Sequence, residues 1–320
     1  MAKLKNVFSW SFSAASDFED CRRKRYWNKY GKWGGWDKNA DPVQKKAYQL
    51  DKMDNLYSIL GQAVELSIMH VLRQHQSGKS CDINTAYDQV AKPFMNRAWK
   101  DSKGELWKQN PKEYKCLREH YYKTLSPEQE KELTVNIIKR TKTCIGNFIR
   151  KTLPRIMDIT PNLELPVQTP EMRGDTEHFV YEGVKIYAIP DYTYRKDGII
   201  HIHDWKAGKQ KNAHKDQLAV YGLWADIKHR KDKEEICAYV EYLKDGKVLT
   251  SVVNDNDLLQ IKNRIESSVA DMTEFLIDAN RERNEPLPKD EWEITTDGKI
   301  CEYCNFYELC ESELHTEGIV

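Results

Sequence analysis

The chain has 320 residues, of which 40% are hydrophobic, and it carries 50 basic and 50 acidic residues. This apolar content is enough for a sizeable buried core, which excludes a disordered or fibrous protein. The formal charge of zero excludes a protein that wraps nucleic acid through overall attraction, so binding of a polyanion must depend on a local patch.

Neither a membrane span nor a secretion signal is indicated by the sequence. No stretch approaches the roughly 18 consecutive apolar residues that a membrane helix needs. The amino-terminal segment contains early acidic side chains and no continuous apolar core, so we expect a cytoplasmic protein. In that compartment the eight cysteines are expected to be thiols or ligands rather than disulfides.

The first half of the chain has the periodicity of helices. A polar, basic helix is expected over residues 11–30, and a second over 51–74, where apolar residues recur every four positions. Residues 84–155 continue this helical pattern with breaks at three prolines, and no strand is indicated among them. These prolines are Pro93, Pro111 and Pro127. We interpret residues 75–160 as a helical insertion.

The second half of the chain alternates strands with helices. Strands are expected over 163–169, 184–194, 199–206, 236–243 and 247–253, and helices over 213–228 and 254–281. This alternation predicts a fold of the α/β (α+β) class, in which a mixed central sheet is flanked by helices. No linker divides the sequence, so we expect one domain over residues 1–320 that carries the helical insertion.

Two acidic residues on a predicted β-hairpin are the strongest chemical signal. If the turn is centred on Asp197 and Gly198, Asp191 lies opposite Asp204, with Cβ atoms about 5 Å apart. Carboxylates at this distance repel unless a cation lies between them, and such hard oxygen ligands suit Mg²⁺ or Mn²⁺. Lys206 lies on the same face of its strand as Asp204. This arrangement suits attack on a phosphodiester, although a cross-strand salt bridge on an exposed hairpin would give the same pattern.

Three motifs in this region match a known nuclease family in order and spacing. They are Pro190-Asp191, Asp204-Trp205-Lys206 and Gln217-Leu218-Ala219-Val220-Tyr221. They resemble the P-D, D-x-K and Q-x3-Y elements of the PD-(D/E)XK nuclease superfamily, and specifically of its RecB-like branch. The resemblance implies a restriction-endonuclease-like fold with catalytic roles for Asp191, Asp204, Lys206, Gln217 and Tyr221. In the family, the helix face shared by the last two residues helps to hold the lysine and the substrate phosphate.

The family also has a Gly-x3-His element on an upstream helix, whose imidazole binds the metal. The matching positions here are Gly61 and Glu65, so a carboxylate replaces the histidine. Glu65 has apolar neighbours on its helix, where an unpaired charge would be costly and a cation would compensate it. The resemblance therefore implies Glu65, Asp191 and Asp204 as ligands of Mg²⁺ or Mn²⁺, and the alternative is that Glu65 is an ordinary surface residue. Ala188, where relatives often have glycine, is a milder departure.

Four distant cysteines suggest a second inorganic site. They are Cys21 near the amino end and Cys301, Cys304 and Cys310 near the carboxyl end. Tetrahedral thiolate sites hold zinc or iron–sulfur clusters, and spacing alone does not separate the two. RecB-like nucleases of the AddB and CRISPR adaptation type use one amino-terminal and three carboxy-terminal cysteines, so the resemblance implies a structural [4Fe-4S] cluster that joins residues 8–37 to residues 286–314. Here Arg22 replaces a frequent proline, and each thiol could instead be buried in the core.

Basic and aromatic residues alternate after the first of these cysteines. The candidates for contact with nucleic acid are Arg22, Arg23, Arg25, Trp33 and Trp36. Such a pattern suits single strands, because bases stack on aromatic rings. Trp27 and Trp33 could equally pack against the cluster or the insertion.

These features together predict a metal-dependent DNA nuclease, expected to be an exonuclease on single-stranded DNA or duplex ends. Relatives work in repair, replication, phage recombination and CRISPR spacer acquisition, and one sequence does not choose among these roles. The chain has no Gly-x4-Gly-Lys-Ser/Thr loop, so a helicase would be a separate partner. The alternative function is a catalytically silent, nuclease-like subunit that holds DNA ends for a repair or CRISPR adaptation complex.

Overall fold

A four-stranded mixed sheet forms the centre of the fold in a computed structural model, which describes residues 5–159, 176–230 and 234–319. Its strands, in their order across the sheet, are β4 (Tyr192–Lys196), β5 (Ile199–Lys206), β6 (Glu235–Tyr242) and β7 (Lys247–Val252). Strands β5 and β6 are parallel, and helix α11 (Ala213–Lys228) lies in the connection between them, whereas the two outer pairs are antiparallel. The predicted mixed sheet with flanking helices is confirmed.

A second, three-stranded sheet contains a strand from the amino end of the chain. Its order is β1 (Ser9–Ser11), β3 (Val184–Tyr187) and β2 (His178–Tyr181), with β1 parallel to β3. The prediction of one strand over 184–194 is wrong, because β3 ends at Tyr187 and the chain then enters the other sheet at Tyr192. Pro190, which has no N–H for a strand ladder, lies in the break. Strand β2 was not predicted, and the expected strand over 163–169 lies outside the described residues.

Helices make up most of the remaining structure. Those before the sheets are α1 (Phe12–Asp20), α2 (Arg22–Tyr26), η1 (Trp27–Gly31), α3 (Pro42–Asp51), α4 (Leu56–Gln76), α5 (Ile83–Ala86), η2 (Tyr87–Ala91), α6 (Lys92–Lys103), α7 (Leu106–Gln109), α8 (Arg118–Tyr121), α9 (Pro127–Asn147), η3 (Phe148–Thr152) and α10 (Leu153–Ile159). Those near the carboxyl end are α12 (Asp255–Thr273), η4 (Ile277–Ala279), η5 (Lys289–Glu291), α13 (Gly298–Glu302) and α14 (Tyr307–Thr316). None of the described helices is both long and apolar enough to cross a lipid bilayer.

Local sequence explains where α9 begins, and the structure corrects two of the helix predictions. Ser126 caps α9 and Pro127 takes its first position, where a missing N–H costs nothing. The predicted break at Pro93 is wrong, because α5, η2 and α6 follow one another directly and the wide π turn of η2 comes just before the proline. The single helix predicted over 11–30 is also wrong, because the extended backbone of Cys21 separates α1 from α2.

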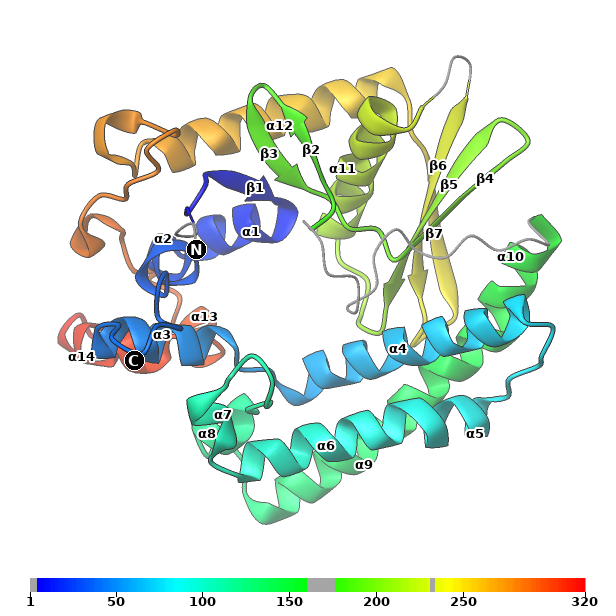
Figure 1. The fold of residues 1–320 in the computed structure, drawn as a ribbon, viewed down its shortest axis with the longest axis horizontal. Helices are drawn as coiled ribbons and strands as arrows, with labels where there is room; N and C mark the ends of the chain where they lie inside the picture. The colour runs from blue at the N-terminus through cyan, green and yellow to red at the C-terminus, as the bar shows by residue number, and fades with distance from the viewer. Residues whose placement is uncertain (1–4, 160–175, 231–233, 320) are drawn as a thin grey trace.

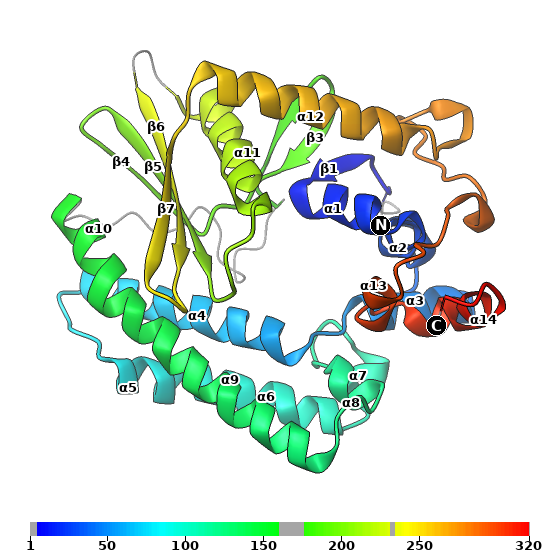
Figure 2. The same ribbon diagram turned by 180° about the vertical axis from the view of Figure 1, so that it is seen from behind.

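The elements are arranged around a ring (Figures 1 and 2). The sheet of β4–β7 lies on one side of the ring, and the helices near the two chain ends, α1 to α3, α13 and α14, lie on the opposite side. Helix α12 connects the two sides along one edge, while α4, α6 and α9 run along the other. Segments from the two ends of the chain are therefore neighbours.

Side chains from both faces of the β4–β7 sheet are buried. On one face, Ile200 and Ile202 of β5 belong to a core with α11 and α12. On the other face, Tyr192, Tyr194 and Trp205 belong to a core with α4 and α9. A smaller core surrounds the carboxy-terminal cysteines. Strand β5 is therefore covered on both faces, whereas the edge strand β7 is largely exposed.

Candidate active site

The pairing of β4 with β5 brings Asp191 and Asp204 together. Tyr192 pairs with His203, which is the register predicted from the turn, and Asp191 immediately precedes this pair. The Asp191 N–H donates to the His203 carbonyl at 3.1 Å, so the pairing continues one residue beyond the strand. The β-hairpin thus fixes both acidic residues relative to each other through backbone hydrogen bonds.

Asp191 lies in a place that opposes its ionisation. One contact favours the ionised form, because its Oδ2 accepts a hydrogen bond from the Trp205 N–H at 2.5 Å. Burial and, second, the negative charge of Asp204 raise the pKa of Asp191 well above its usual value. Two ionised carboxylates are therefore unfavourable here without a compensating cation.

Asp204 is 3% exposed and faces both a phenol and an ammonium group. Its Oδ1 lies 3.2 Å from the Tyr221 hydroxyl. Its Oδ2 lies 2.7 Å from Lys206 Nζ, an ion-pair distance, but this contact lacks hydrogen-bond geometry and the described residues offer Oδ2 no hydrogen-bond donor. The Lys206 ammonium group therefore balances part of the charge on Oδ2, and the remaining lone pair could bind a second cation.

Helix α11 covers the acidic pair with Gln217 and Tyr221. Gln217 Nε2 donates to the Tyr221 hydroxyl at 2.8 Å, and that hydroxyl lies 3.1 Å from the carbonyl oxygen of Ile189. Burial and the nearby Asp204 charge raise the pKa of Tyr221 well above its usual value, so the phenol keeps its proton. The family-based expectation that Gln217 holds Lys206 differs from this geometry, in which Gln217 orients Tyr221.

Glu65 faces the same region from α4. Desolvation by the surrounding protein raises its pKa, the charge of Asp204 adds to this effect, and Lys206 opposes it. The residue nevertheless remains exposed to solvent, so its charge is not enclosed by the apolar neighbours on its helix. Glu65 is therefore a hydrated carboxylate within electrostatic range of the pair.

The carboxylates of Glu65, Asp191 and Asp204 have the charge that a divalent cation needs, but they do not form a preformed coordination site. In the part of the chain that the structure describes, no three His, Cys, Asp or Glu side chains are close enough together to hold a metal ion. The mutual repulsion of the carboxylates, the available Asp204 Oδ2 and the hard oxygen chemistry all favour Mg²⁺ or Mn²⁺. Glu65 and Asp191 would have to reorient to join Asp204 as ligands.

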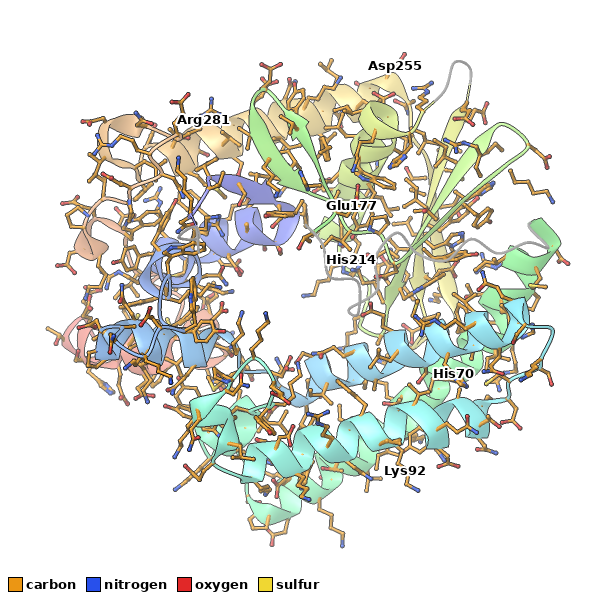
Figure 3. The ribbon with its side chains drawn as sticks, viewed as in Figure 1. His70, Lys92, Glu177, His214, Asp255 and Arg281 are labelled. Carbon is orange, nitrogen blue, oxygen red and sulfur yellow. The ribbon has the colours of Figure 1, made fainter. Side chains whose placement is uncertain are left out.

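His214 belongs to this site but was missed from the sequence. It lies three residues before Gln217 and seven before Tyr221, so the three share a face of α11, and Figure 3 shows it beside the open centre of the ring. Its Nδ1 lies 3.4 Å from the Lys211 N–H and 3.1 Å from the Tyr242 hydroxyl. Burial and, second, the positive charge of Lys206 lower the pKa of His214. The helical spacing from Gln217 was the signal that could have found it.

The four cysteines converge at the junction of the two chain ends. Cys21, Cys301, Cys304 and Cys310 line one narrow cavity, which Trp27 also lines. Burial raises the pKa of Cys304 to about 12 and that of Cys310 to about 11, and the charge of Cys21 contributes to both. Thiolates in such a place need a cation to stabilise them, so the four cysteines fit a metal ion or a cluster chemically. In the described part of the chain, however, their sulfur atoms are not grouped closely enough to form a ready metal site.

Two of the predicted nucleic-acid contacts are structural instead. Arg23 is buried, pairs with Glu313 at 2.8 Å and donates to the Trp292 carbonyl at 2.7 Å. Arg25 is also buried. These two guanidinium groups cannot contact DNA from these positions, so the expectation for them is wrong.

The remaining residues of that group lie nearer the surface. Arg22 pairs with Glu293 across the two chain ends, which occupies its guanidinium. Trp33 is half-buried and Trp36 is 45% exposed. Trp36 is therefore the most accessible aromatic candidate in the predicted segment.

Comparison with known proteins agrees with this geometry. The family model described as "PD-(D/E)XK nuclease superfamily" matches residues 9–311. A comparison with curated proteins gives no significant match. The matched segment contains both sheets, helix α11 and the carboxylate pair, and it extends over most of the chain. The chain therefore belongs to the PD-(D/E)XK nuclease superfamily.

Proposed function

We propose that the protein is a metal-dependent DNA nuclease, an exonuclease that acts on single-stranded DNA or duplex ends. The observation that supports this most strongly is the convergence of Asp191, Asp204 and Lys206 at one end of the β4–β5 hairpin, with Gln217 and Tyr221 above them. Charged groups of opposite sign are held side by side by a rigid sheet, as a site for hydrolysis of a charged ester requires.

Each residue has a definite part in the proposed mechanism. Glu65, Asp191 and Asp204 would hold Mg²⁺ or Mn²⁺, which when bound lowers the pKa of water and polarises the phosphoryl oxygen. Lys206 stabilises the negative charge that develops on the phosphate and helps to position the attacking water. Tyr221, kept protonated and oriented by Gln217, donates a hydrogen bond to Asp204 and so fixes that carboxylate.

His214 adds a neutral donor to this mechanism. Because the Lys211 N–H donates to its Nδ1, the ring proton is assigned to Nε2. We place Nε2–H toward a non-bridging oxygen of the substrate phosphate. In this role the imidazole orients the phosphate and transfers no proton.

The finer assignments concern the cysteines and the branch of the family. We propose that Cys21, Cys301, Cys304 and Cys310 bind a structural [4Fe-4S] cluster, with zinc as the alternative, and that the protein is RecB-like. The shared cavity and the raised pKa values of Cys304 and Cys310 support this proposal. A separate helicase or recombination partner would fit such a nuclease.

The test is degradation of end-labelled DNA. Purified protein is incubated with Mg²⁺ or Mn²⁺ and single-stranded, duplex or flap substrates, each with free or blocked 5′ and 3′ ends. We expect cleavage of single strands that a blocked end prevents, and no cleavage by Asp204→Asn. Cleavage of a strand with both ends blocked would contradict the exonuclease assignment. Equal cleavage by wild type and variant would place the activity elsewhere.

A catalytically silent DNA-end-binding subunit is the second candidate. The observation that favours it is that Glu65 stands where the family has histidine and that no three metal ligands are drawn together among the described residues. Binding of DNA ends with no cleavage on any of these substrates would support this function and contradict the first.

A further inference from the structure

A second cavity with the composition of a nucleic-acid site lies far from the carboxylate pair. It is formed between the tryptophan-rich segment that follows η1, helix α3 and the segment that begins in α7. Its aromatic and basic lining residues are Trp36, Tyr48, Lys38, Lys45, Lys108 and Lys112. We call this the Trp36 cavity. The proposed nuclease mechanism uses none of these residues.

Trp36 is an exposed but well-positioned ring. It makes edge-to-face contacts with Trp33, at 5.1 Å between ring centroids, and with Tyr48, at 5.8 Å. The preceding Gly35 packs directly on α3, since a Cβ atom there would lie 2.3 Å from the Gln44 carbonyl oxygen. The chain is therefore pressed against α3, and the indole is held in place while 45% of it remains accessible. An accessible, preoriented ring of this kind is suited to stacking with a base.

The charge around this ring favours a polyanion. Lys45 Nζ donates to the Lys38 carbonyl at 2.6 Å, which places both residues at one edge of the cavity. Of the four lining lysines, Lys108 alone has an acidic partner among the described residues, Glu105, and both members of that pair are exposed. Asp37 is the acidic residue of the lining. The cavity thus combines aromatic surface with unneutralised ammonium groups, the combination by which proteins bind the bases and phosphates of a single strand.

The cavity lies near the amino-terminal end of α4, the helix that carries Glu65. Helix α3 leads into α4, and Glu65 lies about 14 Å along α4 from its first residue, Leu56. In Figures 1 and 2, α3 and α7 lie at the amino-terminal end of α4, on the other side of the ring from β4–β7. A strand bound at both places would therefore have several nucleotides between them.

We propose that the Trp36 cavity binds a segment of single-stranded DNA remote from the scissile bond, with a base stacked on Trp36 and backbone phosphates on the lysines. This inference rests on the proposed function, because it makes the cavity a second contact for the same substrate strand. According to this inference, the protein binds long strands more tightly than short ones because of residues outside the carboxylate site.

The experiment measures binding without cleavage, by fluorescence anisotropy of labelled oligodeoxythymidylate in the presence of EDTA. Oligomers of about 24 and about six nucleotides are compared, because the short one cannot reach both sites. The variants are Trp36→Ala, Trp36→Phe and the triple variant Lys38→Gln/Lys45→Gln/Lys112→Gln. Lys92→Gln, on α6 at the edge of the molecule in Figure 3, is the matched lysine control.

We expect Trp36→Ala to weaken binding of the long oligomer roughly five- to 100-fold, and Trp36→Phe to restore most of it. The triple variant should reduce the slope of log affinity against log salt by about 2, whereas Lys92→Gln should not change it. Binding of the short oligomer, which can occupy only one site at a time, should fall by a smaller factor in Trp36→Ala than binding of the long oligomer. A long-oligomer affinity unchanged in Trp36→Ala, or reduced equally for both lengths, would overturn the proposal.

The result also separates this inference from the nuclease proposal. If wild type cleaves DNA and Trp36→Ala binds the long oligomer normally, the nuclease function stands and the second site is wrong. If Trp36→Ala loses binding but wild type cleaves no substrate with either metal, the second site stands and the nuclease function is wrong.

Discussion

The carboxylate site and the four-cysteine site are assembled in different ways. Asp191, Asp204 and Lys206 come from one hairpin, and their spacing follows from strand pairing between close neighbours in sequence. Cys21 lies nearly the whole chain away from Cys301, Cys304 and Cys310, and the four meet only after both ends have folded back. The first site is thus fixed by local geometry and the second by the global fold.

The two sites also differ in how the protein would respond to losing an ion. Removing a cation from the carboxylate site leaves repulsion between two acids, but the β-sheet that carries them remains hydrogen-bonded. If the cysteines bind a cluster as proposed, its removal would release a connection between the chain ends, although Arg23–Glu313 and other contacts also join them. We therefore expect the first site to affect activity much more than stability, and the second to affect stability strongly.

The largest effect is expected for Asp204→Asn, which preserves shape but removes the central charge. Activity on single-stranded DNA should fall at least about 10³-fold, because charge stabilisation at the phosphate would be lost. The melting temperature, measured by differential scanning fluorimetry, should change little. A large fall in melting temperature would mean that Asp204 is mainly structural and would remove the contrast between the two sites.

Cys301→Ser should have the largest effect on stability. Ligation that joins the two ends of the chain removes up to about 5 kcal/mol of loop-closure free energy. We expect loss of bound iron and a melting temperature lower by about 5–10 °C, with iron content measured after anaerobic purification. Cys237→Ser, which alters a half-buried cysteine outside the cavity, is the control. Stoichiometric zinc without iron in the wild type would contradict the cluster proposal.

His214→Gln tests the newly identified member of the carboxylate site. A hydrogen bond to a charged group contributes about 1.5–3 kcal/mol, so loss of the donor should lower kcat roughly ten- to 100-fold. KM should change little if the contact forms mainly in the transition state. His70→Gln on α4, also labelled in Figure 3, should retain full activity. Equal kcat values for the two variants would exclude His214 from the mechanism.

The smallest effect concerns the dependence of stability on pH. The pKa of Asp191 is raised in the folded protein, so the folded state binds more protons than the unfolded state between the ordinary carboxyl pKa and the raised value. Metal-free wild type should therefore lose stability as pH rises through this window, and Asp191→Asn should lose less. Thermal melting in EDTA from about pH 4 to pH 8 checks this. Identical pH profiles would show that the pKa of Asp191 is not raised in the folded protein.

The sequence predicted the features that depend on local rules. The turn at Asp197-Gly198 sets the register, so the meeting of Asp191 and Asp204 followed from counting, and the helix containing Gln217 and Tyr221 followed from periodicity. The features that it missed depend on tertiary contacts. The burial of Arg23 requires Trp292 and Glu313 from the other end of the chain, and no local pattern shows that a basic residue will be enclosed.

The break between β3 and β4 shows the same limit. Residues 184–194 alternate as one strand would, and only the proline hints that the chain changes sheets. The sequence also left the exposure of Glu65 open, because helix periodicity identifies the apolar stripe but not which flanking position faces solvent.

The parallel pairing of β1 with β3 has a practical consequence for anyone who expresses this protein. Ser9, Trp10 and Ser11 pair with Lys185, Ile186 and Tyr187, and the chain reaches Asp191 only four residues later. Deleting residues 1–11 would remove β1, the edge strand that pairs with β3. Fusing a bulky tag directly before Ser9 would place the tag against this strand. If such a truncated or tagged protein were inactive, the cause would be displacement of the segment that leads to Asp191, and the result would not show that the intact protein lacks nuclease activity.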